Sequence, residues 1–246
     1  MVDIGSGKQL YLNCSGKPGS PTVILEAGSE ATSHSWAQVQ PQVARFARVC
    51  SYDRAGLGRS SSSGHEESVA ENVADLHSLL QHAGISPPYL LVGHSSGGLR
   101  VQKYQAQFPT EVAGMVLVDS AHEEQIWRFS DAVPGSVRGI PADPANLPRL
   151  GMLPPRQRSQ WHTDIPLIVV EHTPGQMSVA GTPTQRALLE YTMHALQEDL
   201  AKRSTKGELR TAAHSGHDIP NDEPRAVVLA IRDVMSRVGA MLSKVL

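Results

Sequence analysis

The amino-acid sequence predicts an α/β fold, with a mostly parallel central sheet flanked by helices. Short apolar runs rich in β-branched residues alternate with longer amphipathic segments, which is the order of βαβ units. The runs are continuously apolar, as expected for buried parallel strands. The chain has 246 residues, a length that α/β folds occupy as one domain, so we expect a single domain over residues 1–246.

Seven apolar runs mark the expected strands of the sheet. No segment repeats at a fixed period, so repeat architectures are excluded. The expected strands lie at residues 10–14, 22–25, 48–52, 89–92, 115–118 and 167–170, with a weaker one at 209–213.

Capping signals and apolar periodicity mark the helices between these runs. Ser68 and Glu71 stand three residues apart, so each can satisfy an end group of the other in a capping box that starts a helix. Further helical segments cover residues 99–108 and 188–200. Pro224 lies in the first turn of a last helix, whose apolar stripe should pack on the sheet.

Composition and charge exclude several classes of protein. Hydrophobic residues make up 40% of the chain, and 22 Lys and Arg oppose 24 Asp and Glu, for a net charge of −2. Such a chain offers no basic field to nucleic acid or anionic lipid. Its longest apolar runs fall far short of the ~18 residues of a membrane span. We therefore expect a soluble protein with no nucleic-acid partner and no membrane span.

The cysteine count and the N-terminal residues favour a reducing compartment. Cys14 and Cys50 allow at most one disulfide and are not spaced as a metal-binding pair. The first residues contain neither the basic region nor the apolar region of a signal peptide. We expect a cytoplasmic protein, with secretion after removal of a signal peptide as the alternative.

The strongest local signal is an apolar strand that runs into Gly-x-Ser-x-Gly and then into a helix. The motif reads GHSSG at residues 93–97. A sharp strand-to-helix turn would strain the backbone of Ser95, and side chains at positions 93 and 97 would collide across it. With this turn the sequence resembles the α/β-hydrolase superfamily. The resemblance implies that Ser95 is an exposed nucleophile at the start of a helix.

Two further motifs resemble the same superfamily in the same order. The run VILEAGS at residues 23–29 resembles the strand and loop that supply half of an oxyanion hole. The resemblance implies that the backbone N–H groups of Ser29 and Ser96 hold the oxyanion. The run DRAGLGRS that starts at Asp53 resembles a glycine-rich turn. We interpret Asp53 as structural, because it can bond local backbone groups.

A serine hydroxyl needs a base to take its proton, and in this superfamily the base is a downstream histidine. His217 lies between the last strand and the last helix, where the superfamily places that residue. We prefer it to His214, which lies near the strand end. His94 is expected to pack near the turn and to border the substrate pocket. No histidines have metal-site spacing, so we expect no metal and no cofactor.

The carboxylate that should orient the histidine is missing from its usual place. After the last strong strand, relatives place an aspartate where this chain has Gly175. A minority of the superfamily carries the acid one strand earlier, and Asp119 ends that earlier strand. We choose Asp119, which keeps the chain order of serine, acid and histidine. Glu171, Glu123 or no acid at all are the alternatives, and Glu190 is interpreted as helix surface.

The pattern of strands and helices fails between residues 123 and 160. Six prolines interrupt this stretch, while scattered large apolar side chains argue against disorder. We interpret residues 123–160 as an insertion that forms a lid, with Trp127 and Met152 as candidate walls of the substrate pocket. The alternative is a surface loop far from that pocket.

Together these residues predict a serine hydrolase that acts on a small carboxylic ester. Ser95 would attack the acyl carbonyl, His217 would carry the proton, and Asp119 would orient the imidazole. The expected partner is a small-molecule ester, and no oligomeric state is predicted. Carbon–carbon bond hydrolysis, acyl transfer and peroxide chemistry are alternatives within the same fold. A catalytically silent α/β-hydrolase-fold binding protein is the alternative from another class.

Overall fold

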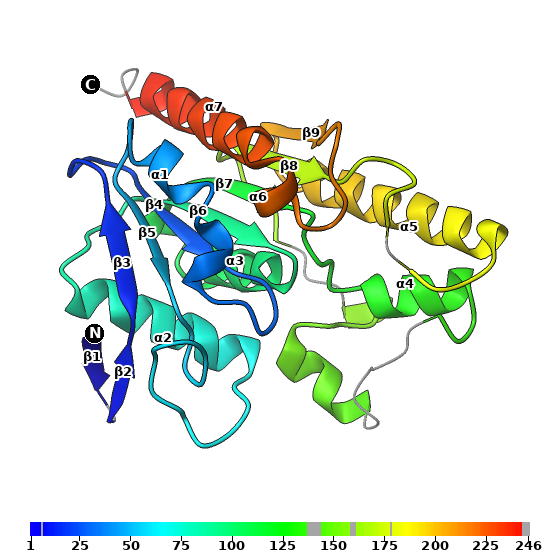
Figure 1. Cartoon of the computed structure of the whole chain (residues 1–246), viewed down its shortest axis with the longest axis horizontal. Coiled ribbons are helices and arrows are strands. Elements are labelled where there is room, and N and C mark those ends of the chain that lie inside the picture. The colour runs from blue at the N-terminus through cyan, green and yellow to red at the C-terminus, as the bar shows by residue number, and fades with distance from the viewer. Residues whose placement is uncertain (6, 137–143, 158–160, 178, 243–246) are drawn as a thin grey trace.

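A seven-stranded sheet forms the centre of the protein, which confirms the predicted α/β class. A computed structural model describes residues 1–5, 7–136, 144–157, 161–177 and 179–242 (Figure 1). The strand order in the sheet is β3-β5-β4-β6-β7-β8-β9, and β3 is antiparallel to β5 while every other neighbouring pair is parallel. The strands of this sheet are β3 (Leu12–Ser15), β4 (Thr22–Glu26), β5 (Val49–Tyr52), β6 (Tyr89–His94), β7 (Val112–Val118), β8 (Leu167–Glu171) and β9 (Gly207–Thr211).

A separate two-stranded hairpin precedes the sheet. It joins β1 (Val2–Gly5) to β2 (Lys8–Leu10). The strand expected at residues 10–14 is divided between β2 and β3, and β1 was not expected. Both hairpin strands are short and largely half-buried or exposed, so they lack the continuous apolar run of the buried strands.

Helices lie on both faces of the sheet and beyond one end of it (Figure 1). None of the described helices is long and apolar enough to cross a membrane. The α-helices are α1 (Gln40–Val43), α2 (Val69–His82), α3 (Ser96–Gln107), α4 (Gln125–Ala132), α5 (Pro183–Lys202), α6 (Ile219–Asp222) and α7 (Pro224–Leu242). Short 3₁₀ helices are η1 (Ser33–Trp36), η2 (Pro109–Glu111), η3 (Pro144–Leu150) and η4 (Pro155–Gln157).

Alternate residues of the central strands face opposite sides of the sheet and build two cores. In β6, Leu90 belongs to the cluster formed with α1 and α7, whereas Leu91 belongs to the cluster formed with α2 and α3. This division follows from the two-residue period of a strand. Because helices cover both faces, the strands can be apolar throughout. The carboxyl ends of the parallel strands meet at one edge, where the connecting loops carry the polar residues described below.

The predicted capping box at the start of α2 is confirmed. The Glu71 N–H donates to Oγ of Ser68 at 3.2 Å, and the Ser68 N–H donates to the Glu71 carboxylate at 2.7 Å. The helix ends just before Gly84, whose φ of 64° lies in the left-handed region that a helix end commonly requires. The local sequence thus sets both ends of this helix.

A disulfide links two neighbouring strands near the edge of the sheet. Cys14 of β3 and Cys50 of β5 are direct cross-strand partners and are joined with a Cα–Cα distance of 4.1 Å. Disulfides persist in oxidising compartments and are rare in the cytosol. The pairing uses both cysteines of the chain, and the compartment of the protein stays a prediction.

The described part of the 123–160 insertion contains one α-helix, α4, which packs against α5. Phe129 and Val133, near the C-terminal end of α4, form a small apolar cluster with Leu189 and Met193 of α5. The prolines that follow α4 confine the rest of the described insertion to short 3₁₀ turns. Residues 137–143 and 158–160 of the expected lid lie outside the described residues.

Candidate active site

Ser95 lies on a strained turn between β6 and α3. Its backbone has φ 53° and ψ −127°, in a region that non-glycine residues rarely adopt. A Cβ on Gly93 would lie 2.7 Å from the Gly97 carbonyl oxygen, and one on Gly97 would lie 2.5 Å from the Glu26 carbonyl oxygen. Only glycines fit at these two positions, which is the steric reason for the motif's spacing.

Asp119 follows β7 directly beside the serine. β6 and β7 pair in parallel, with His94 opposite Val118. The next residues of the two strands, Ser95 and Asp119, therefore emerge at the same edge of the sheet. The Asp119 N–H donates to the Val170 carbonyl at 2.7 Å, and its φ of 37° turns the chain away from the strand. The side chain is 2% exposed.

The structure brings three of the predicted residues into one hydrogen-bonded chain. The Nε2 atom of His217 lies 3.0 Å from Oγ of Ser95, and its Nδ1 atom lies 2.6 Å from Oδ2 of Asp119. A neutral imidazole in this position donates from Nδ1 to the carboxylate and accepts at Nε2 from the hydroxyl. This is the arrangement that makes a serine a nucleophile.

His94 supports the loop that carries His217. Its Nε2 atom lies 2.8 Å from the His217 carbonyl oxygen, and its ring meets Trp36 edge-on at 6.4 Å. Burial, followed by the charge of His217, lowers the pKa of His94, which favours the neutral ring that donates one hydrogen bond. His94 is not among the residues that line the pocket around Ser95. The alternative base, His214, is exposed on the same loop.

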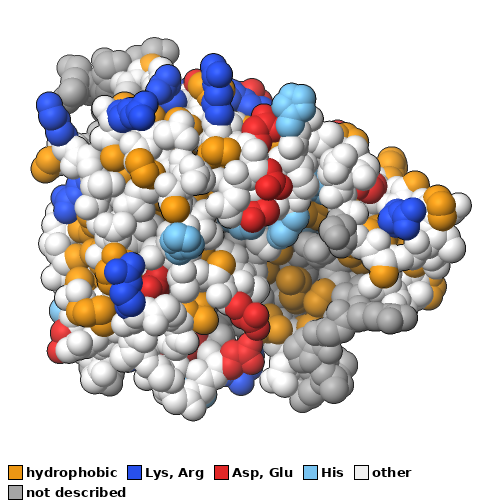
Figure 2. Space-filling model, in the orientation of Figure 1, with side chains coloured by type: hydrophobic (Ala, Val, Ile, Leu, Met, Phe, Trp, Pro, Cys, Tyr) orange, Lys and Arg blue, Asp and Glu red, His pale blue; other side chains and the backbone are white. Residues whose placement is uncertain are grey.

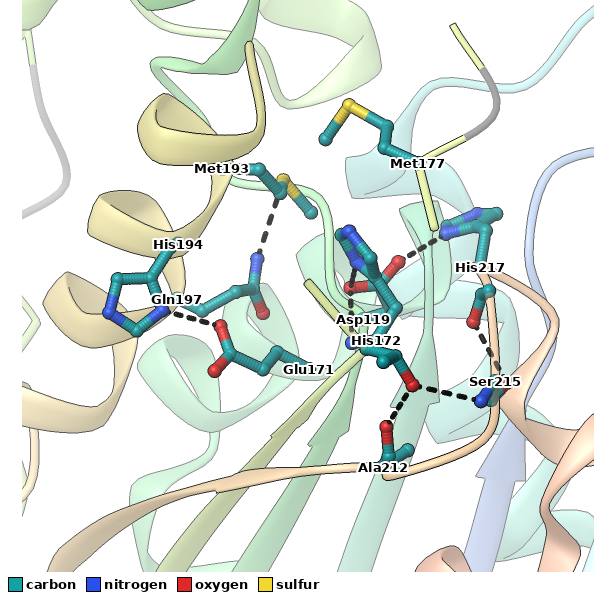
Figure 3. Close-up of polar contacts among 12 residues, drawn as sticks. Asp119, Glu171, His172, Met177, Met193, His194, Gln197, Ala212, Ser215 and His217 are labelled. Atoms are coloured by element: carbon teal, nitrogen blue, oxygen red, sulfur yellow. Dashed lines mark hydrogen bonds and ion pairs between the residues drawn. The ribbon is translucent and has the colours of Figure 1, made fainter. Parts of the chain in front are cut away.

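A second histidine, which the sequence interpretation missed, contacts the same aspartate. Nδ1 of His172 lies 2.8 Å from Oδ1 of Asp119 (Figure 3). Its Nε2 atom lies 3.0 Å from Oε2 of Glu190 on α5. Burial would raise the pKa of Asp119, but hydrogen bonds from the two histidines outweigh it and hold the pKa at about 2. Glu190 is therefore not simply helix surface, as the apolar pattern of its helix suggested.

The alternative acids face other partners. Glu171 binds Nδ1 of His194 at 2.8 Å and accepts from the Thr211 hydroxyl at 3.0 Å, so its carboxylate is turned toward α5 (Figure 3). Glu123 accepts from Arg203 at 2.7 Å. Among the carboxylates considered from the sequence, Asp119 is the one whose oxygen bonds the ring of His217.

The loop after β4 approaches the serine from the other side. A Cβ on Gly28 would lie 3.3 Å from Cβ of Ser95, which shows how closely this loop passes the serine. The next side chain, Ser29, donates to the Ser96 hydroxyl at 2.9 Å. The backbone N–H groups expected to form the oxyanion hole thus belong to residues whose side chains are in contact.

A buried arginine holds this loop in place. Arg54 donates to the carbonyl oxygens of Ala27 and Gly28 at 2.8 and 2.6 Å and pairs with the fully buried Glu26 at 2.7 Å. The neighbouring Asp53 accepts from two backbone N–H groups, at 2.8 and 3.0 Å, as expected for a structural turn. The glycine-rich turn therefore stabilises the loop that faces Ser95.

A pocket of about 310 Å³ opens over the hydrogen-bonded chain. The face drawn in Figure 2 is hollowed, with hydrophobic side chains on the floor of the hollow. The insertion contributes Gln125 and Phe129 to the lining of this pocket, which does not include Trp127 or Met152. Positions 125 and 129 share one face of α4, and position 127 lies on the opposite face. The pocket is lined by Ser95, Asp119, Ala121, Gln125, Phe129, His172, Met177, Val179, Met193 and His217.

No metal site accompanies this arrangement in the parts of the chain that the structure describes. Groups of three or more His, Cys, Asp or Glu side chains arranged to hold an ion are absent there. The polar groups around Ser95 are instead paired with one another.

Comparisons with known proteins identify the family. A family model described as alpha/beta hydrolase fold matches residues 21–160, and the chain belongs to this family. A Bacillus subtilis protein described as uncharacterized, YqjL, is 28% identical over 217 residues, covering 87% of this chain and 83% of the relative. An AB hydrolase superfamily protein of Gibberella zeae is 34% identical over 131 residues, covering 50% of this chain and 41% of the relative.

Solved structures share the fold at low sequence identity. A thermophilic esterase from Thermogutta terrifontis aligns with a TM-score of 0.64 at 17% identity, covering 93% of each chain. An enol-lactonase from Burkholderia xenovorans aligns with a TM-score of 0.65 at 16% identity, covering 96% of this chain and all of that structure. The chain therefore has an α/β-hydrolase fold, and the solved structures that are similar to it include an esterase.

Proposed function

We propose that the protein is a serine hydrolase that cleaves small carboxylic esters through an acyl-enzyme intermediate. The observation that carries this proposal is the chain of two hydrogen bonds from Ser95 through His217 to Asp119, at the floor of a pocket. A nucleophile, a base within 3.0 Å and a carboxylate that orients the base are the parts that acyl transfer requires.

The first half of the reaction forms the acyl-enzyme. His217 takes the Ser95 proton at Nε2 as Oγ attacks the ester carbonyl, and Asp119 stabilises the imidazolium that forms. The backbone N–H groups of Ser29 and Ser96 donate to the developing oxyanion. The imidazolium then gives its proton to the leaving alcohol. The start of α3 beneath the serine also favours negative charge there.

The second half releases the acid. Water enters the place of the alcohol, His217 takes a proton from it, and the resulting hydroxide attacks the acyl carbon. The tetrahedral intermediate collapses, Ser95 leaves with the proton from His217, and the carboxylic acid departs. The apolar lining of Phe129, Met177 and Met193 suits a small apolar group on the ester.

Ester hydrolysis tests the proposal directly. We expect turnover of p-nitrophenyl acetate and butyrate by the wild-type protein and background rates for Ser95→Ala. A fluorophosphonate probe should label the wild type and leave Ser95→Ala unlabelled. A folded wild type with neither turnover nor labelling would contradict the proposal and favour a silent binding protein of the same fold.

A further inference from the structure

We propose that His172 and Glu190 form a second imidazole–carboxylate pair on the triad aspartate, and that His172 is a positioning residue that acts in its protonated form. The inference rests on the proposed function, because it assigns a role within that reaction. It concerns residues outside the predicted chain of Ser95, His217 and Asp119.

The carboxylate of Asp119 is divided between two imidazoles. Its Oδ2 atom bonds Nδ1 of His217 at 2.6 Å, and its Oδ1 atom bonds Nδ1 of His172 at 2.8 Å (Figure 3). The backbone N–H of His172 also donates to Oδ1, at 3.3 Å. With both oxygens held from opposite sides, the carboxylate plane cannot rotate away from His217 without breaking a contact to His172.

The two ring nitrogens of His172 both face carboxylates. Nδ1 faces Asp119 at 2.8 Å and Nε2 faces Glu190 at 3.0 Å, while 6% of the side chain is exposed. A neutral imidazole has only one N–H, so one carboxylate would face a lone pair. The protonated ring donates to both, which is the arrangement that satisfies every partner.

The charges around His172 favour the same protonated form. Asp119 approaches from the end of β7 and Glu190 from α5, and the paired Glu171 and His194 line a pocket together with His172. Burial lowers the pKa of His172, but hydrogen bonds and charges from Asp119 and Glu190 outweigh burial and raise the pKa to about 9. At neutral pH the ring is therefore a cation between two anions.

Glu190 extends this network to the pocket wall. Its Oε2 atom bonds His172, and its Oε1 atom accepts from the Met177 N–H at 2.6 Å. Met177 lines the pocket that contains Ser95. One carboxylate of α5 thus holds both the second histidine and a segment of the wall, so that the position of α5 is tied to the position of Asp119.

Deprotonation of His172 should weaken the hydrogen bonding that holds the Asp119 carboxylate in place. One ring nitrogen then presents a lone pair to a carboxylate instead of an N–H. The orientation of the Asp119 carboxylate relative to His217 is then less tightly fixed. Small misplacements of a catalytic group lower kcat more than they change substrate binding. The wild-type enzyme should accordingly lose kcat as the pH rises through about 9, the pKa of His172.

Four variants separate a positioning role from a merely structural one. His172→Ala removes both ring contacts, and we expect kcat to fall by roughly 10- to 100-fold with little change in KM. His172→Asn keeps a donor for Asp119 without a titrating ring, so it should recover most of kcat at neutral pH and lack the transition near 9. Glu190→Gln should move that transition to lower pH. His194→Asn, on the exposed side of α5, is the control and should keep the wild-type pH profile.

A titration by NMR provides the readout that does not depend on activity. In the wild type, one histidine ring signal that is absent from His172→Asn should titrate near pH 9. Titration of that signal near 6.5, or a kcat profile of His172→Asn that overlays the wild type, would overturn the proposal. If the wild type shows the titration but neither hydrolyses esters nor reacts with fluorophosphonate, the proposed function fails while the charged pair on Asp119 stands.

Discussion

The carboxylate of Asp119 meets the ring of His217 across 98 residues of sequence, with 2.6 Å between Oδ2 and Nδ1. The contact exists because β7 pairs beside β6, and Ser95 follows β6 directly. The strand after the insertion, β8, ends instead at Glu171, and His172 follows it. Asp119 thus follows the strand that is adjacent to the one that Ser95 follows.

Removal of the negative charge at Asp119 is the first prediction. We expect Asp119→Asn to lower kcat for p-nitrophenyl butyrate by about 10⁴-fold, because an amide neither selects the Nδ1–H tautomer nor stabilises the imidazolium. Glu171→Gln, which changes the alternative acid, should stay within about tenfold of the wild type. The opposite ranking of the two variants in steady-state kinetics would contradict the assignment of Asp119.

The second prediction concerns the addition of a methyl group at Gly97, in the turn beneath Ser95. In Gly97→Ala the new Cβ would lie 2.5 Å from a backbone carbonyl of β4, so the turn must shift, with a loss of about 1–3 kcal/mol in the free energy of unfolding. Labelling by fluorophosphonate should slow as well. Gly239→Ala on α7 is the matched control, because nothing lies within 4 Å of its new Cβ, and it should stabilise by about 0.5–1 kcal/mol. Equal urea midpoints for the two variants would refute the steric argument.

The pH dependence of stability is the third prediction. The folded state raises the pKa of His172 to about 9 from 6.5, so protonated His172 stabilises the fold fully below pH 6.5, and this contribution is lost as the pH rises through 9. The loss is on the order of 3 kcal/mol at most. Urea unfolding at pH 6 and pH 10 should show a larger decrease for the wild type than for His172→Asn. An equal decrease in both proteins would show that another group is responsible.

Reduction of the disulfide is the fourth prediction. The Cys14–Cys50 bond closes a loop with a sequence separation of 36, and such loops stabilise a protein by about 2–4 kcal/mol through the unfolded chain. Thermal unfolding with and without dithiothreitol should therefore show a lower Tm for the reduced protein. The double variant with alanine at both positions should be indifferent to dithiothreitol. A wild-type Tm that dithiothreitol leaves unchanged would contradict a stabilising disulfide.

The fold could be predicted from the sequence because its strands are buried on both faces. Burial on both faces makes strands such as 89–92 and 167–170 continuously apolar, which is visible without a structure. The hairpin strand β1 was missed because its burial is mixed. Ser95 and His217 were proposed from the sequence for another reason, since each lies in a local motif at the end of a predicted strand.

The contacts that sequence reasoning missed depend on which strands become neighbours. His172 and Asp119 are 53 residues apart, and they meet because Val118 pairs with Val170 in the parallel sheet. Polar residues directly after two buried strands were the available signal. Glu190 reaches them from a helix whose rotation about its axis follows from tertiary packing. No helix was predicted over Gln125–Ala132, so there was no helix face from which to choose between Trp127 and Phe129.

The pocket wall is the subject of the last prediction. Phe129 lines the pocket over Ser95 and packs against α5, whereas Trp127 lies on the opposite face of α4. Phe129→Leu should enlarge the space for the ester's apolar group, and we expect the ratio of kcat/KM for p-nitrophenyl octanoate over butyrate to rise by about tenfold. Trp127→Leu is the matched control and should leave this ratio unchanged. A ratio that responds to Trp127→Leu and not to Phe129→Leu would mean that the substrate contacts the other face of α4.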